Sequence, residues 1–124
     1  EYVADGILQG KLYNIAGYPG AIESEHTEDT VYGEVYKIVH KHPLLTRLDE
    51  FEGCTEQFPR PHEYIRKKLL ISLVTGHNLS AWVYIYNRSV LHRQPIKSGD
   101  YLRFLNNDPT NSIFHSDSHR KDWF

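Results

Sequence analysis

The 124-residue chain contains no methionine, only one cysteine and no long apolar run. Cys54 alone cannot form an internal disulfide, so we expect a fold held by packing in a reducing compartment. The longest apolar stretches, such as 68–74, fall far short of the roughly 20 residues that span a bilayer, and no signal-like segment opens the sequence. These absences predict a cytoplasmic protein without a membrane partner. Because the sequence begins at Glu1 and not at a methionine, we interpret it as lacking an N-terminal segment.

An excess of positive charge is also missing. The chain carries 14 Lys and Arg against 16 Asp and Glu, which gives a formal net charge of −2. This balance excludes the basic field that neutralises a phosphate backbone, so we expect no nucleic acid partner. Of the residues in the chain, 40% are hydrophobic and 24% are charged, a composition typical of one compact domain with a single core.

Four segments have the β-branched, aromatic and alternating character of strands. A turn is expected after the first of them, at Gly17-Tyr18-Pro19-Gly20. The triplet Gly76-His77-Asn78 favours a short hairpin between the last two, because glycine and asparagine tolerate positive φ. We expect the first two segments to pair in the manner of a hairpin. The predicted strands are 7–15, 31–39, 64–75 and 79–86.

One segment, 43–51, has a helical pattern, started by a proline that suits the first helical turn and stopped by a glycine. At about 100° per residue its apolar side chains gather on one face, and Glu52 projects into this apolar stripe whereas Glu50 points away. A carboxylate on a buried face tends to have a raised pKa, as acid/base chemistry at neutral pH requires. Glu52 is therefore the candidate acid/base. The alternative is a helix that ends one residue earlier, with Glu52 merely at its end.

Seven short motifs follow one another between Gly6 and Arg103, and their order carries more information than any one of them. They are Gly10-x-Leu12-Tyr13, Gly17-Tyr18-Pro19-Gly20, Val31-x-Gly33-Glu34-Val35-Tyr36, Leu48-Asp49-x-x-Glu52-Gly53, Tyr64-x-Arg66, Ala81-Trp82-Val83-Tyr84-x-Tyr86 and Ser98-Gly99-Asp100-Tyr101. In this arrangement the chain resembles the γ-glutamylcyclotransferase-like family, which includes the γ-glutamylamine cyclotransferases and the AIG2-like proteins.

The resemblance implies an α+β fold, a small mixed β-barrel with a helix packed against it. We assign this domain to residues 1–105 and expect 106–124 to be a polar C-terminal tail with partial helix. The implied reaction is the cyclisation of a small γ-glutamyl amide to 5-oxoproline, with release of an amine or amino acid. In this family the essential carboxylate corresponds to Glu52, which would act as base and then as acid. No metal or organic cofactor is expected, because the nucleophile is tethered to the electrophile.

The resemblance also marks candidate substrate-binding residues. Tyr101 matches a position that lines the pocket in related proteins, and we expect Tyr64 and Tyr84 to face the same cavity. Core packing is the alternative role for these two tyrosines. Arg66 is a candidate partner for a substrate carboxylate, or else an ordinary surface or supporting arginine.

One family feature is missing from the sequence. Family members usually begin with a strand that runs into a Tyr-Gly-Ser/Thr-Leu loop, whose backbone N–H groups bind the glutamyl moiety. The only Tyr-Gly pair here is Tyr32-Gly33, which lies in a different strand. We interpret the first strand as lost by truncation. The alternative is a natural variant without the loop and with weak or absent activity.

Other chemistries have weaker support in the sequence. Cys54 as a nucleophile lacks a neighbouring histidine, and the pairs His40-x-His42 and His115-x-Asp117-x-His119 lack an evident third metal ligand. The main rival to catalysis is a binding module for a small ligand or a protein on the same fold, followed by a structural interaction protein. Neither the leaving group nor the oligomeric state follows from the sequence.

Overall fold

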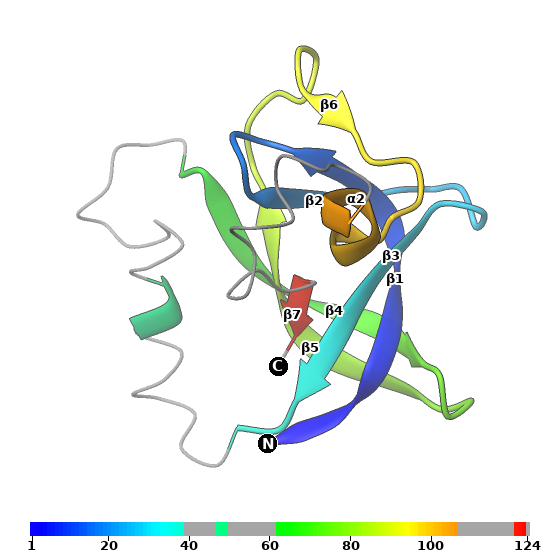
Figure 1. Cartoon of the computed structure of the whole chain (residues 1–124). Coiled ribbons are helices and arrows are strands. Elements are labelled where there is room, and N and C mark those ends of the chain that lie inside the picture. Colours follow the sequence, from blue (N-terminus) through cyan, green and yellow to red (C-terminus); the bar gives the residue numbers. More distant parts are fainter. Residues whose placement is uncertain (39–46, 50–61, 107–120, 124) are drawn as a thin grey trace.

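A sheet of seven strands dominates the protein (Figure 1). The computed structural model describes residues 1–38, 47–49, 62–106 and 121–123. The strands are β1 (Tyr2–Asn14), β2 (Pro19–Glu23), β3 (Thr30–Tyr36), β4 (Tyr64–Leu73), β5 (Asn78–Tyr86), β6 (Gln94–Pro95) and β7 (Lys121–Trp123), and α2 (Tyr101–Asn106) is a short helix. The fold is therefore mixed α+β.

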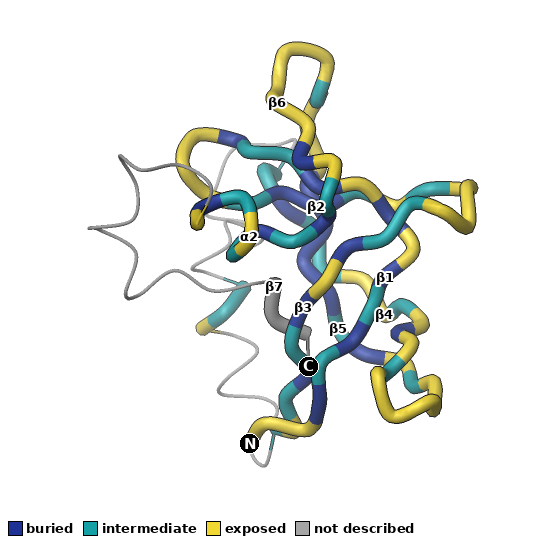
Figure 2. Tube along the Cα trace, turned by 45° about the vertical axis from the view of Figure 1, so that its right-hand side comes forward, coloured by how far each residue is buried: buried dark blue, intermediate teal, exposed yellow. Residues whose placement is uncertain are grey.

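β1 is the central strand of the sheet and pairs with four other strands. Buried and less buried residues follow one another along it (Figure 2). Ala4, Leu8 and Leu12 are buried on one face. This period of two is the pattern from which the strand was predicted. β1 pairs antiparallel with β3 along one edge and with β4 along the other, and its second half also pairs with β2 and β6.

The hairpin of β4 and β5 confirms the clearest local prediction. The two strands pair antiparallel from Tyr64 opposite Tyr86 to Ser72 opposite Asn78. Gly76 in the connecting turn has a φ of 96°, a value that favours glycine. The predicted pairing of the first two segments is confirmed as well, since β1 pairs with β3.

The main strand order is β5-β4-β1-β3-β7, and within the described residues it does not close into a ring. The two ends, β5 and β7, nevertheless lie close to each other (Figure 1). β7 pairs parallel with β3, so the last described residues of the segment expected to be a polar tail are part of the sheet. The pairing of Gly33 with Lys121 joins residues 88 positions apart in the chain (121 minus 33).

β2 and α2 were not predicted. Pro19 and Gly20 favour a turn, but Pro19 is the first residue of β2, where a proline is tolerated.

In the predicted helix 43–51 the structure describes Arg47, Leu48 and Asp49, and these three are helical. None of the helices in the described ranges is long and apolar enough to cross a membrane.

Two clusters of buried side chains cover the two faces of β5. Ala81, Val83 and Ile85 belong to the larger cluster, which also holds Tyr101. Tyr84 and the neighbouring Tyr86, Tyr64 and Ile15 form the second cluster, against which Leu48 packs. Because β5 is buried on both faces, its second half is almost continuously apolar and aromatic.

Candidate functional site

Asp49 joins the helical residues 47–49 to the β4–β5 hairpin. Its Oδ1 accepts a hydrogen bond from the Tyr84 hydroxyl at 2.6 Å and lies 3.1 Å from the Arg66 Nε. The Arg66 and Asp49 side chains are 26% and 20% exposed, so water screens this ion pair less than one on the open surface. The guanidinium also lies over the Trp82 ring, 4.7 Å from its centroid. Asp49 is thus held by a charged donor and a neutral one.

The register of the hairpin creates this arrangement. Arg66 stands directly opposite Tyr84, and Lys68 stands opposite Trp82, so all four side chains lie on one face of the two strands. A slip of one residue would move either strand's side chains to the other face. The site of Asp49 therefore depends on the pairing of β4 with β5.

Replacing Tyr84 by phenylalanine is expected to lower the free energy of unfolding by about 2 kcal/mol, because a buried hydrogen bond to a charged group is lost. Urea unfolding measures this change. Tyr32→Phe is the matched control, since the Tyr32 side chain is on the exposed side and its hydroxyl has no hydrogen bond with a described residue. Equal stabilities of the two variants would contradict the bond to Asp49.

The turn between β1 and β2 is held by two of the candidate tyrosines. The Tyr101 hydroxyl donates to the carbonyl of Gly17 and the Tyr64 hydroxyl donates to the carbonyl of Pro19, both at 2.8 Å. Arg93 adds a bond from Nη1 to the carbonyl of Ile15 at 2.6 Å. Tyr64 comes from one buried cluster and Tyr101 from the other, so the turn is where the two cores meet.

Tyr18 stands on the outer side of the same turn and donates to the Glu63 carboxylate. Partial desolvation, and then the hydrogen bond to Glu63, raise the pKa of Tyr18 to about 12. Burial raises the pKa of Tyr101 as well. Both phenols are therefore neutral at physiological pH, where they act as hydrogen-bond donors and not as bases.

The structure describes the three candidate tyrosines but not the candidate acid/base. Tyr64, Tyr84 and Tyr101 are 3%, 2% and 2% exposed, and each hydroxyl donates to a protein oxygen. A phenol oxygen that donates can still accept, so a substrate-binding role stays a prediction. Glu52 and Cys54 lie outside the described residues, as do the histidines at 40, 42, 115 and 119.

The sequence did not predict the ion pair between Arg66 and Asp49 or the contact of Arg93 with the turn between β1 and β2. Arg66 was considered as a substrate or supporting residue, but its partner Asp49 is 17 positions away and no sequence spacing reveals the pair. Arg93 does not belong to any of the seven sequence motifs. Across the part of the chain that the structure describes, no group of three or more His, Cys, Asp or Glu side chains could hold a metal ion.

The comparison with known families decides the assignment. The model of the family described as gamma-glutamyl cyclotransferase, AIG2-like, matches residues 2–103. The chain belongs to this family. The match covers every strand described above except β7 and confirms the resemblance carried by the seven sequence motifs.

Relatives in this family match most of the chain. The gamma-glutamylcyclotransferase family protein YtfP of Escherichia coli K12 is 38% identical over 92 residues, which are 74% of this chain and 67% of that protein. The corresponding protein of Citrobacter rodentium is 37% identical over 102 residues, or 82% and 73% of the two chains. The chain thus spans about two thirds to three quarters of these relatives. No solved structure matches it.

Proposed function

We propose that this protein is a cytoplasmic γ-glutamylcyclotransferase that converts a γ-glutamyl amide into 5-oxoproline and a free amine or amino acid. The observation that carries the proposal is the anchoring of Asp49 by Arg66 and Tyr84. Asp49 is the described acid of the Leu48-Asp49-x-x-Glu52-Gly53 motif, and Glu52 follows it by three residues.

The anchoring separates the roles of these two acids. The Asp49 carboxylate is engaged by a guanidinium and a phenol, and these contacts tie the helical residues to the hairpin. A carboxylate held by protein donors in this way is less available to a substrate. We therefore assign the structural role to Asp49 and the acid/base role to Glu52.

The reaction is balanced within one substrate molecule. Glu52 takes a proton from the substrate's α-ammonium, and the freed amine attacks the γ-carbonyl carbon to close a five-membered ring. The bond from that carbon to the amide nitrogen then breaks, and Glu52 returns its proton to the leaving nitrogen. The second proton that the ring nitrogen must lose also passes to the leaving nitrogen, which departs as an ammonium. Ring closure gains from proximity because amine and carbonyl belong to the same chain of atoms.

Two further parts of the proposal concern the surroundings of Glu52. The hydroxyls of Tyr64, Tyr84 and Tyr101 are proposed to accept hydrogen bonds from the substrate while their own protons remain on protein oxygens. The sheet is proposed to be part of a small mixed β-barrel with the helical residues packed against it. The proximity of β5 and β7, the ends of the strand order, supports this arrangement.

The test is the release of 5-oxoproline, measured by liquid chromatography, from γ-glutamyl-amino acids and from γ-glutamyl-ε-lysine. We expect 5-oxoproline from at least one of them and none from the matched α-glutamyl dipeptides, in which the scissile bond is not at the γ-carbonyl. Absence of 5-oxoproline with the whole panel would refute the proposal. Binding of a γ-glutamyl amide without turnover would instead identify a non-catalytic binding module.

A further inference from the structure

A hollow of about 380 Å³ lies where β1 passes from one partner strand to another. Residues 10–13 of β1 line it together with two flanking segments, 28–30 and 95–97. Among the described residues that line it, none is assigned to the cyclisation. The volume is at the small end of the range for ligand sites in proteins.

Backbone hydrogen bonds hold both sides of the hollow. The N–H of Gly10 donates to the carbonyl of Asp29 at 3.1 Å, and the N–H of Ile96 donates to the carbonyl of Leu12 at 2.8 Å. Lys11 lies between these two attachment points. The sides are therefore held at a set separation by β1 itself.

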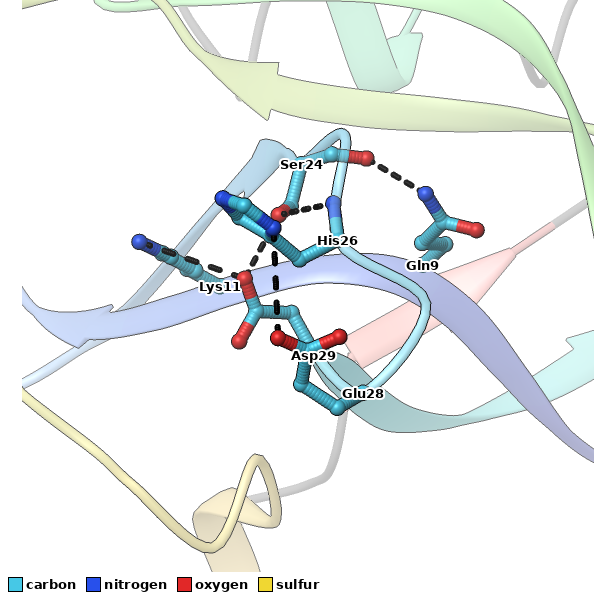
Figure 3. A network of polar contacts seen from close by, with 6 residues as sticks. All are labelled: Gln9, Lys11, Ser24, His26, Glu28 and Asp29. Atoms are coloured by element: carbon cyan, nitrogen blue, oxygen red, sulfur yellow. Dashed lines mark hydrogen bonds and ion pairs between the residues drawn. The ribbon is translucent and has the colours of Figure 1, made fainter.

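Charges of both signs surround the hollow. Asp29 Oδ2 accepts a hydrogen bond from the Ser24 hydroxyl at 2.6 Å, and Lys11 Nζ lies 3.9 Å from the same oxygen (Figure 3). The Glu28 carboxylate is 3.9 Å from the His26 Nδ1. Both 3.9 Å contacts are too long for hydrogen bonds, so Lys11 and Glu28 keep donor and acceptor capacity for a ligand.

Lys97 adds a second cation to the lining. Its side chain is exposed and makes no ion pair or hydrogen bond with any described residue. With Lys11 it balances the charges of Asp29 and Glu28, so the formal charge of the lining is zero. The apolar residues Leu12, Tyr13, Pro95 and Ile96 also belong to the lining.

We propose that this hollow binds a zwitterion of dipeptide size, with its ammonium near Asp29 and Glu28 and its carboxylate near Lys97 and Lys11. A ligand with one charge of each sign pairs with both kinds of lining side chain. A ligand with several negative charges, such as a nucleotide, would meet two carboxylates and too few cations. Binding here does not depend on the proposed cyclisation, because no described residue of the lining is assigned to that reaction.

The experiment is an amide-resolved NMR titration of the full chain with alanyl-alanine, an α-linked dipeptide that is not a γ-glutamyl substrate. We expect saturable shifts at Lys11, Asp29 and Lys97. The N-acetylated dipeptide and the dipeptide amide, each lacking one charge, are expected to bind at least about tenfold more weakly. Equal affinity for the three compounds, or no saturable shift, would overturn the proposal.

Two lysine variants distinguish this site from general attraction by the protein's charge. Lys97→Gln is expected to weaken alanyl-alanine binding by about tenfold without changing the urea midpoint, because Lys97 makes no ion pair with any residue that the structure describes. Lys37→Gln removes the same charge from an exposed side chain outside the hollow and is expected to leave the affinity unchanged. The same loss in both variants, or in neither, would count against the assigned contacts.

Discussion

Replacing Glu52 by glutamine is expected to lower the rate of 5-oxoproline formation by at least about 100-fold, the lower end of the contribution of a general acid/base. Glutamine has nearly the same size as glutamate but cannot take a proton from the α-ammonium or return one to the leaving nitrogen. The loss should therefore appear in kcat, with a smaller change in KM. Steady-state kinetics on the best substrate of the panel measures both values.

Glu50→Gln is the matched control for this experiment. It removes the same charge two positions away, from a side chain that the helical pattern directs to the opposite side. We expect its kcat to remain within about twofold of the original protein, a difference small on the scale of catalytic effects. If Glu52→Gln retains activity, or if both variants lose it equally, the assignment of Glu52 as the acid/base is wrong.

Replacing Gly99 by alanine is expected to cost the fold at least about 3 kcal/mol, among the larger effects of a single substitution. Gly99 has a φ of 69°, which disfavours residues with a Cβ. A Cβ there would also lie 1.8 Å from the carbonyl oxygen of Thr30. Relief of this clash requires a backbone shift that breaks the 2.8 Å hydrogen bond from the N–H of Tyr32 to the carbonyl of Gly99.

Gly76→Ala separates the two causes of this loss. Gly76 has a φ of 96°, but a Cβ at this position would meet nothing within 4 Å. The control should therefore show only the dihedral cost of about 1–2 kcal/mol. Urea unfolding of both variants gives the comparison. A Gly99→Ala variant no less stable than Gly76→Ala would mean that the backbones at 99 and 30 do not approach so closely.

The sequence by itself determined the features that depend on local patterns. The mix of apolar and polar residues identified β1 and β3, because a strand places every second residue on the same face. Runs of β-branched and aromatic residues identified β4 and β5. Gly76 and the residues beside it marked the hairpin, because few residues adopt its positive φ. The order of the seven motifs was enough to predict the family.

Only the tertiary structure decided which distant side chains meet. Asp49 and Tyr84 are 35 positions apart in the chain, and their contact depends on the packing of the helical residues against one face of the hairpin. The sequence pattern predicted that Tyr64 and Tyr84 lie on strands. It did not predict that they belong to one buried cluster and Tyr101 to the other. The physical reason is that alternation gives two equivalent faces, and the segments that cover each face decide which side chains become neighbours.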